Sequence, residues 1–364
     1  MSVTKNITFF LQEETGISSG NSVSWSLHRT ALDAGYLTAG NQYFCYGWAN
    51  CVSPGTNEGA TKWAFIGGDD LQGSTQERHD TNNSGMSIVH LGTFTAPDPV
   101  LPIGIYRKVL FDGGGTESTE AGQFFIIDIT DASNDTLPIS HAADTSNRTV
   151  GIGATIQAHA IDMTGGTCLL TATCRAYGGD GTPTLLGLYI GSDLVSSGSR
   201  FTQDSQDNNQ ILLGGAFSLN SGDVISLKNI DDGTTVTTTY SYISAINVAK
   251  GAAASQTGHL TNWVDYGGSG SWGSVNTAGG EESFVFVMGR QKSPGIGSGR
   301  PAGVSVKNNT QDSWMAFSSR PLGDFNSHYF PATEAGADMG QYSTAAVVGT
   351  SVFASGDEIQ VYTV

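Results

Sequence analysis

Apolar and polar residues alternate with a period of two along much of this chain, which is the pattern of half-buried β-strands. FSLNSGDVISL (217–227) and SVFASGDEIQV (351–361) each end in such a strand, so that Ile225 and Leu227 fall on one face. Both stretches contain Ser-Gly-Asp, which predicts a tight turn because glycine accepts positive φ and the aspartate side chain can bond the backbone two residues further along the chain. The pattern therefore predicts antiparallel strands joined by short turns.

A longer strand is predicted in TTVTTTYSYISAINV (234–248), and FFIIDI (124–129) resembles its counterpart earlier in the chain. Helical patterns are nearly absent, and SLHRTALDAG (26–35) is the best helical candidate. In the long strand one parity is apolar and is expected to face a core; it comprises Val236, Tyr240, Tyr242, Ile246 and Val248.

The four cysteines reveal an internal repeat. They lie in FCYGWANC (44–51) and TCLLTATC (167–174), and 168 − 45 and 174 − 51 both give 123. The repeat continues downstream, because residues 63–94 parallel residues 186–217 in order. In a third copy, ESFVFVMGR (282–290) takes the place of the cysteine strand, and AGVSVKNNTQDSWMAF (302–317) follows as a hairpin.

The repeat predicts an all-β chain of three tandem antiparallel β-sandwich modules. We place them at residues 1–132, 133–250 and 251–364, with the boundaries in the linker-like stretches DASNDTLP and AKGAAASQTG. A length of 364 residues fits three domains of ordinary size.

The cysteine spacing argues against a disulfide or zinc. Residues i and i+6 of a strand lie about 20 Å apart, whereas a disulfide requires Cα atoms within about 7 Å. Zinc sites prefer two to four residues between paired cysteines, and neither stretch contains a histidine. We interpret Cys45, Cys51, Cys168 and Cys174 as small buried residues on equivalent strands.

Charge restricts the choice of partners. Sixteen basic and 33 acidic residues give a formal net charge of −17, which repels nucleic-acid phosphates and anionic lipids. MSVTKNITFFLQEETG lacks the basic and apolar regions of a signal peptide, and no apolar stretch reaches the length of a membrane span. We expect a soluble chain made in a host cytoplasm that binds neither nucleic acid nor membrane.

The Ser-Gly-Asp strand endings resemble the jelly-roll modules of the tumour-necrosis-factor and C1q type, over the second halves of the second and third modules. Modules of that type usually trimerise, and similar modules occur in decoration, head-fibre and receptor-binding proteins of tailed bacteriophages. The resemblance therefore implies a trimeric virion protein. The first module departs from the pattern, since FTAPDPVLPIGIYRKVLF (94–111) has no Gly-Asp turn, and we expect it to be the attachment end.

Candidate catalytic chemistry is weak throughout. GISSG (16–20) matches a nucleophile elbow around Ser18, but the strand pattern of NSVSWSL follows it where a helix is required. No P-loop sequence occurs, and the seven histidines form no His-x-x-x-His pair. Adjacent carboxylates such as Asp69 and Asp70 favour solvated turns over a calcium site, because no Asp-x-Asp-x-Asp-Gly loop is present. We expect no enzyme activity, no metal and no cofactor.

Two loop segments rich in aromatic residues are the binding candidates, namely 262–274 and 319–331. Aromatic faces beside Asp or Asn suit sugar recognition, but they also suit a core or a subunit interface. The candidate ligand-binding residues are Trp263, Tyr266, Trp272 and Tyr329.

The sequence therefore predicts a non-enzymatic structural protein on a virion surface, either a capsid decoration protein or a fibre protein. Its expected partners are further copies of itself and the major capsid protein or other virion proteins. The alternative is a carbohydrate-binding or receptor-binding module at a phage tail or fibre.

Overall fold

The computed structural model is built almost entirely from antiparallel β-strands. Within the part that it describes, the one helical element is a single 3₁₀ turn, η1 (Ala34–Tyr36). The structure describes residues 9–20, 24–52, 59–71, 76–78, 85–109, 117–130, 139–177, 182–202, 209–230, 235–247, 270–276, 282–292, 304–308, 310, 313–314, 342–352 and 356–363.

The first sandwich consists of two four-stranded sheets, with strand orders β1-β8-β3-β6 and β2-β7-β4-β5. This arrangement of eight strands in two sheets is the jelly roll. We number the positions 1 to 8 along the chain, so that in this sandwich position 3 lies between positions 8 and 6. The strands are β1 (Phe9–Gly20), β2 (Ser26–Leu32), β3 (Gln42–Val52), β4 (Gly59–Phe65), β5 (Gln76–Arg78), β6 (Gly85–Thr95), β7 (Ile103–Val109) and β8 (Glu117–Asp128).

The second sandwich repeats these orders, with sheets β10-β17-β12-β15 and β11-β16-β13-β14. Position 1 is divided here between two short strands, β9 and β10, which both pair with β17 at position 8. The strands are β9 (Ile139–Asp144), β10 (Arg148–Val150), β11 (Thr155–Ala160), β12 (Gly166–Tyr177), β13 (Thr182–Ile190), β14 (Asp193–Thr202), β15 (Asn209–Leu219), β16 (Val224–Asn229) and β17 (Val236–Asn247).

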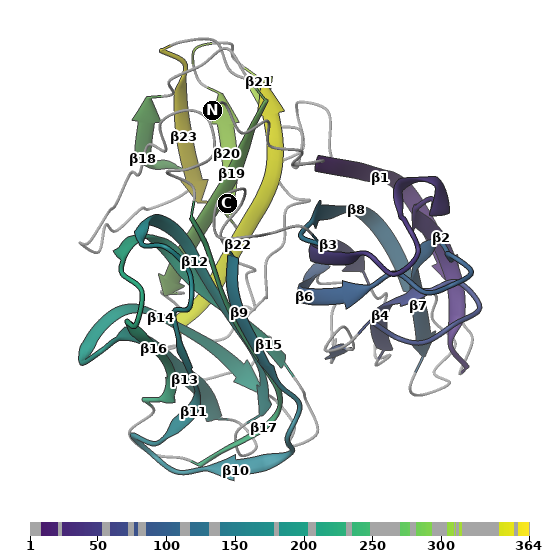
Figure 1. Ribbon diagram of the computed structural model, residues 1–364. Coiled ribbons are helices and arrows are strands. Elements are labelled where there is room, and N and C mark those ends of the chain that lie inside the picture. Colours follow the sequence, from purple (N-terminus) through teal and green to yellow (C-terminus); the bar gives the residue numbers. More distant parts are fainter. Residues whose placement is uncertain are drawn as a thin grey trace, which may run out of the picture.

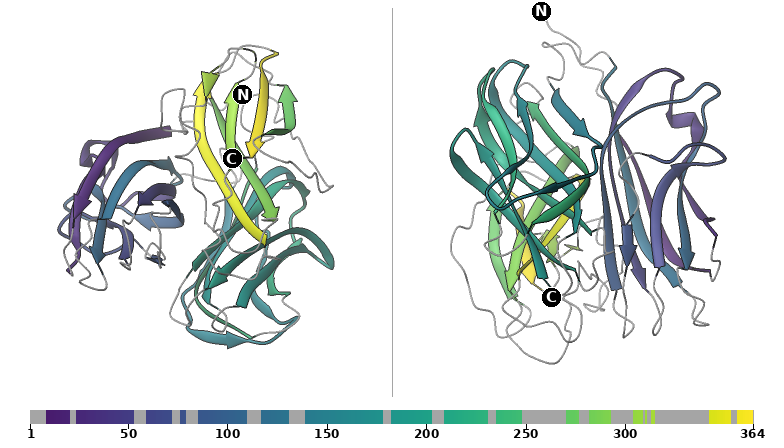
Figure 2. Two further views of the ribbon diagram at one scale, coloured as in Figure 1. Left: turned by 180° about the vertical axis from the view of Figure 1, so that it is seen from behind. Right: turned by 90° about the horizontal axis from the view of Figure 1, so that it is seen from below.

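The C-terminal sheets follow the same plan as far as the structure describes them. The order β18-β23-β20-β21 matches positions 2, 7, 4 and 5, and the pair β19-β22 matches positions 3 and 6. Figures 1 and 2 show these sheets (green to yellow) beside the second sandwich (teal). The strands are β18 (Gly270–Asn276), β19 (Glu282–Lys292), β20 (Val304–Asn308), β21 (Ser313–Trp314), β22 (Tyr342–Val352) and β23 (Glu358–Thr363).

The all-β prediction is confirmed, and so are the predicted equivalences between strands. The cysteine stretches lie in β3 and β12, both at position 3, and FFIIDI lies largely in β8, the counterpart of β17. The predicted module boundaries near 132 and 250 fall in residues 131–138 and 248–269, outside the described residues, so the division into three modules stays a prediction.

The Ser-Gly-Asp turns have the predicted backbone conformation. Gly222 has φ +91° and Gly356 has φ +86°, in the left-handed region that only glycine adopts readily. In the first turn the Asp223 carboxylate accepts the backbone N–H of Asn220 at 2.7 Å, whereas we expected it to bond further along the chain. Each turn joins positions 6 and 7.

The best helical candidate, residues 26–35, does not form an α-helix, because its first seven residues form β2. Ala31 and Leu32 are buried there in the first core, and pairing with β7 supplies the backbone hydrogen bonds that a helix would have made internally. Tertiary packing outweighs a short helical pattern here.

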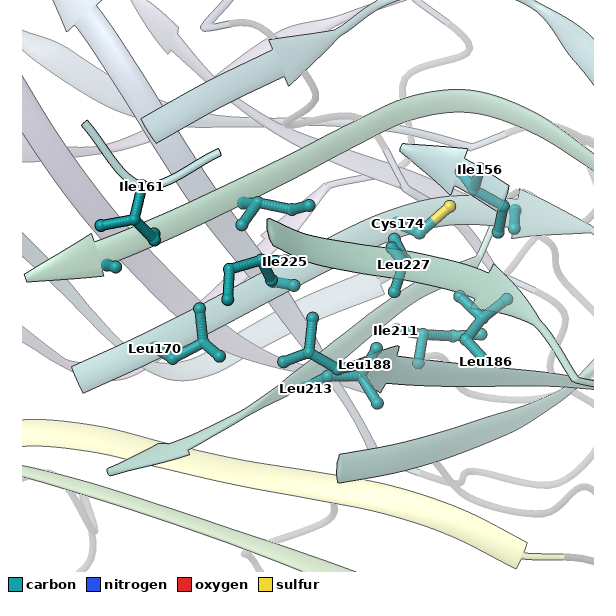
Figure 3. Packing of buried hydrophobic residues seen from close by; sticks show 14 of the residues in the cluster. Ile156, Ile161, Leu170, Cys174, Leu186, Leu188, Ile211, Leu213, Ile225 and Leu227 are labelled. Atoms are coloured by element: carbon teal, nitrogen blue, oxygen red, sulfur yellow. The ribbon is translucent and has the colours of Figure 1, made fainter. Parts of the chain in front are cut away.

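Each sandwich buries its own apolar core between its two sheets. In the second core, Leu170 and Leu213 from one sheet pack against Leu186, Leu188 and Leu227 from the other (Figure 3). Three of the cysteines belong to these cores as free, buried thiols, namely Cys45, Cys168 and Cys174. The side chain of Cys51 lies outside the described residues.

Candidate assembly interface

The outer face of β17 is buried even though it does not face the core of its own sandwich. Tyr240 is 4% exposed and Tyr242 is fully buried, and neither belongs to the second core. Val236, Ile243 and Ala245 of the same strand do belong to that core. Both faces of this strand are therefore covered.

A bulge explains how β17 serves two faces. The pairing of β17 with β12 shifts by one residue between Arg175 and Ala176, so Thr239 has no partner on β12. Val236 lies before this shift and Tyr240 lies after it, and the extra residue moves them to opposite faces. The prediction that Val236, Tyr240, Tyr242 and Ile246 share one buried face is therefore wrong. The predicted fifth member, Val248, lies outside the described residues.

Tyr240 reaches from the second sandwich to the first. Its hydroxyl donates a hydrogen bond to the backbone carbonyl of Leu91 in β6, at 3.1 Å across 149 residues of sequence. Burial raises the pKa of this phenol above its ordinary value, and the nearby thiol of Cys45 in β3 raises it further. The contact therefore joins the two sheets that contain position 3.

The first sandwich presents an equally buried outer face. Tyr43 and Cys45 of β3 point into the first core, so Phe44 and Tyr46 lie on the other face, and each is 2% exposed. Leu91 is 1% exposed and pairs directly with Tyr46. We call Tyr46, Leu91, Tyr240 and Tyr242 the tyrosine interface.

Hydrogen bonding across the tyrosine interface is sparse. Within the described residues, the hydroxyls of Tyr46 and Tyr242 are buried without a hydrogen-bond partner of good geometry, although Ser244 and Thr93 lie near the Tyr242 hydroxyl and lower its pKa against the larger effect of burial. The outer face of the second sandwich also carries buried hydroxyls that do have partners. Thr171 and Ser244 hydrogen-bond to each other at 2.7 Å, and Thr173 donates to the carbonyl of Ile211 at 3.0 Å. The described side chains of this interface are therefore mainly buried aromatic and apolar ones, and the hydrogen bond from Tyr240 to Leu91 fixes its register.

A second contact zone lies along β15. This strand approaches β5 and β6 of the first sandwich, and together with β14 it approaches β19 and β22 of the C-terminal sheets. The three parts of the molecule therefore meet around the sheet edge at position 6 of the second sandwich.

One serine and one histidine lie together in the second sandwich, but they form no catalytic site. Ser140 Oγ lies 2.6 Å from His159 Nε2 and accepts the backbone N–H of Asp162 at 3.2 Å. Ser140 is only 1% exposed, so a substrate could not reach it. The contact links β9 to β11, which belong to the two different sheets of this sandwich. Ser18, the sequence candidate, lies inside β1 and pairs with Thr119, so it does not occupy an elbow.

In a recess beside β9 and β11, the charged side chains that line it pair with each other. Arg148 donates to Asp144 at 2.6 Å and to the backbone carbonyl of Ile156. The hydrogen bond from Arg148 is the main cause that lowers the pKa of Asp144 to about 2. Because the arginine is already paired, this recess offers no charge to a ligand.

The described part of the structure does not bring the predicted ligand-binding residues together. Trp263, Tyr266 and Tyr329 lie outside the described residues, and Trp272 lies in β18 with its side chain outside the description. In the described part of the chain, no group of three His, Cys, Asp or Glu residues is placed to hold a metal ion, and no helix is long and apolar enough to span a membrane.

Sequence reasoning missed the tyrosine interface, although a signal was present. YSYISAI (240–246) carries apolar residues on both parities, and so does FCY (44–46). In an antiparallel sandwich one face of a strand is usually solvated, so apolar residues on both faces indicate a second covered face.

No protein-family model matches this chain, and no curated protein matches it. Solved structures similar to it include a chain of the Macrobrachium rosenbergii nodavirus, at 13% identity over 68% of this chain and 99% of that one, with a TM-score of 0.23. A triple jelly-roll turret protein of an archaeal virus is similar at 10% identity over 98% and 89%, with a TM-score of 0.22. A tandem CBM22 domain from Paenibacillus barcinonensis Xyn10C is similar at 8% identity over 67% and 98%, with a TM-score of 0.20.

At these TM-scores the similarities add nothing to the argument, and the jelly-roll assignment rests on the strand orders. None of these three structures is described as a tumour-necrosis-factor or C1q module, or as a protein of a tailed bacteriophage.

Proposed function

We propose that this chain is a non-enzymatic structural protein on the exterior of a virion, as a capsid decoration or fibre protein of a tailed bacteriophage. The observation that supports the proposal is the tyrosine interface, which covers the outer faces of two jelly rolls with each other. A protein that uses its β-sheet faces for packing between sandwiches is suited to building a rigid layer or rod.

The mechanism is geometric. Two sandwiches joined over buried aromatic side chains move as one unit, so a force applied to one is transmitted to the other. Many copies on a regular lattice would hold more strongly than any single contact, through avidity. The net charge of −17 keeps the exposed surface hydrated and repels nucleic acid.

We further propose that the chain assembles as a homotrimer on the major capsid protein or another virion protein, after synthesis in the host cytoplasm. Closed symmetry is the usual form of such assemblies. Binding to nucleic acid or to a membrane forms no part of this role.

Immunolabelled electron microscopy tests the proposal. Particles from the source are labelled with an antibody against the purified chain, and the control is the same antibody pre-absorbed with that chain. Regular label over heads or along fibres is the expected result. Label confined to tail tips would favour receptor binding instead, and unlabelled particles would contradict the virion role.

A further inference from the structure

The sheet β11-β16-β13-β14 of the second sandwich has an outer face with exposed apolar side chains, which we call the distal face. Leu188 and Leu227 of this sheet point into the second core, so alternate residues of the same strands lie on the distal face (Figure 3). Val224 at the start of β16 is 45% exposed there, and Leu194 in β14 is 51% exposed. Large apolar side chains exposed together on one sheet face indicate a binding surface.

One row of the distal face crosses all four strands. Ser226 of β16 pairs with Ala158 of β11 on one side and with Tyr189 of β13 on the other. Tyr189 pairs in turn with Leu194 of β14. These partners already include the register shifts of β11 and β14, so the four residues lie on the same face of the sheet.

A glycine lets the apolar side chains of the distal face lie flat. A Cβ atom added at Gly187 in β13 would lie 2.9 Å from both Leu194 Cδ1 and Tyr189 Cε2, and 3.0 Å from Ile230 Cγ2. These three side chains therefore lie across the glycine, close to the backbone of the sheet. The result is a flat apolar surface, which suits packing against another sheet face.

Lys228 and Asp223 lie toward opposite ends of β16, on either side of Ser226. The Lys228 ammonium lies 4.4 Å from the ring centroid of Tyr189. Asp223 directly precedes Val224, and its carboxylate accepts the backbone N–H of Asn220. A twofold rotation about an axis through Ser226 exchanges the two ends of this strand.

We propose that the distal face binds the same face of a second copy of this chain, about a twofold axis that follows the row from Ala158 to Leu194. Residues on the axis then face their own counterparts, so that Tyr189 and Leu194 pack against the same two residues of the second copy. Residues off the axis exchange partners, so that Lys228 of each copy lies beside Val224 and Asp223 of the other. Unlike charges meet at both ends of the contact.

A second copy fits the distal face better than a partner of another kind. The apolar row meets an identical row, and each lysine meets an aspartate, so one patch supplies both halves of the contact. This self-complementarity is the property that an isologous interface requires. A sugar site would instead place converging polar groups among its aromatic rings, whereas aliphatic side chains such as Leu194 and Val224 dominate here.

The first sandwich has a similar row, whose lysine is already paired. Leu27 of β2 pairs with Tyr106 of β7, and Tyr106 pairs with Lys62 of β4. Leu27 is 42% exposed, like Leu194 in the second sandwich. Lys62 forms an ion pair with Asp70 in the same chain, so its charge is compensated without a partner. This row therefore supplies the matched controls.

The size of the distal face sets the expected strength of the contact. Four strands about 4.8 Å apart, with about six residues each, cover roughly 20 by 20 Å. This is roughly half of the area that each partner buries in a stable interface. We therefore expect weak association of the isolated chain, with a Kd of about 10 to 100 µM, which avidity would strengthen on a particle.

This contact goes beyond the proposed virion role and differs from the proposed threefold assembly. A twofold contact closes after two chains, and it joins two trimers into six chains where the trimer forms as well. The proposals fail separately. A chain that pairs through the distal face but labels no virion contradicts only the virion role, and labelled particles with a chain that never pairs contradict only this contact.

The first test measures the mass of the purified full-length chain by light scattering from about 1 to 300 µM. We expect the mass to rise toward two chains, or toward six. Leu194→Ala should weaken this association about tenfold, because the same side chain is lost from both halves of the contact. Leu27→Ala is the matched control and should associate like the wild type. A mass of one or three chains throughout would overturn the proposal, and so would equal behaviour of the two variants.

Cross-linking tests the position of the axis. Leu194→Cys places a thiol on the axis, so a short bis-maleimide should join two copies across the roughly 10 Å between facing sheets. Val224→Cys places its two thiols about 13 Å further apart along the strands, so it should give no cross-link. The wild type controls for the natural cysteines. No cross-link with Leu194→Cys, or an equal yield with Val224→Cys, would contradict this axis.

Charge reversal tests the exchanged ends. Lys228→Glu should weaken association about tenfold, because it sets like charges together at both ends. Adding Asp223→Asn should restore part of the loss, since it removes the repulsion and keeps an oxygen that accepts the N–H of Asn220. Asp33→Lys in the first sandwich is the control, because Asp33 is exposed and makes no side-chain cap hydrogen bond. Association of Lys228→Glu at the wild-type level, or a double variant no tighter than Lys228→Glu, would contradict this arrangement.

Discussion

The two faces of β17 show two ways of burying a strand. Its inner face places Ile243 and Ala245 among aliphatic side chains from both sheets of the second sandwich. Its outer face places Tyr240 and Tyr242 against the first sandwich, where the Tyr240 hydroxyl is hydrogen-bonded and the Tyr242 hydroxyl has no partner of good geometry among the described residues. The inner face holds one sandwich together, and the outer face joins two.

The difference between the two faces indicates which substitutions each one tolerates. The core is apolar and close-packed, so its stability depends on filling volume. The tyrosine interface combines large aromatic area with polar groups that are only partly satisfied, which is the composition of a contact between folded units. Changes on the two faces should therefore separate folding of a sandwich from docking of the sandwiches.

The largest effect is expected in the second core. Leu188→Ala removes a fully buried side chain and leaves a cavity, which should lower the free energy of unfolding by about 2 to 5 kcal/mol. Denaturant titration measures the loss. Leu194→Ala is the matched control, since Leu194 in β14 is 51% exposed and its loss should change stability by less than about 0.5 kcal/mol. Equal losses at both positions would mean that the core is misassigned.

Truncation at the interface should have a smaller effect that is confined to docking. Tyr242→Ala removes a buried aromatic ring and should weaken the contact between sandwiches by about 2 to 3 kcal/mol. Hydrogen exchange should accelerate in β6, around Leu91, while the amides that pair β13 with β16 keep their protection. Faster exchange throughout the second sandwich would show that the ring supports folding rather than docking.

A finer comparison concerns the two hydroxyls. Tyr240→Phe removes the hydrogen bond to Leu91 and leaves its carbonyl unpaired, at a cost of about 1 to 3 kcal/mol. Tyr242→Phe removes a buried hydroxyl that has no partner within the described residues, so it should be neutral or stabilising. Melting temperatures of the two variants measure the difference. A larger loss for Tyr242→Phe than for Tyr240→Phe would reverse the assignment.

Much of the fold followed from sequence because the repeat places equivalent strands in order. Cys45 and Cys168 marked position 3, and the Ser-Gly-Asp turns marked the step from position 6 to position 7. Local patterns carried this information, since a turn glycine and an alternating strand each act over a few residues. The strand orders within the sheets could not be read in this way, because they depend on pairings between distant segments.

The candidate site was harder to predict for a physical reason. A bulge adds one residue and exchanges the two faces of a strand, and nothing in TTVTTTY (234–240) marks Thr239 as the extra residue. The alternating pattern therefore predicted that Tyr240 and Val236 share one face of the strand, whereas they lie on opposite faces. The partner carbonyl of Leu91 belongs to the backbone, and its contact with Tyr240 across 149 residues depends on how two folded sandwiches dock.

The smallest expected effect is a pH dependence at the edge of the same sheet. Burial lowers the pKa of His141 below 6.5, with a further contribution from His159, while Asp162 opposes the shift. Burial likewise lowers the pKa of His159, and Asp162 opposes it. The folded chain therefore binds fewer protons than the unfolded chain, and stability present above pH 6.5 is lost as the pH falls below that value.

His141 also lies beside the tyrosine interface, with its ring centroid 6.0 Å from that of Tyr242. Its protonation should therefore loosen docking before it unfolds either sandwich. Asp144 acts in a separate window, because its pKa of about 2 causes a loss only as the pH falls through and below 3.8. His141→Gln should reduce the loss of stability just below pH 6.5 and leave the acid step intact, and Asp144→Asn should do the reverse. Stability curves of the two variants against pH measure this, and an unchanged upper step in His141→Gln would assign that step to His159.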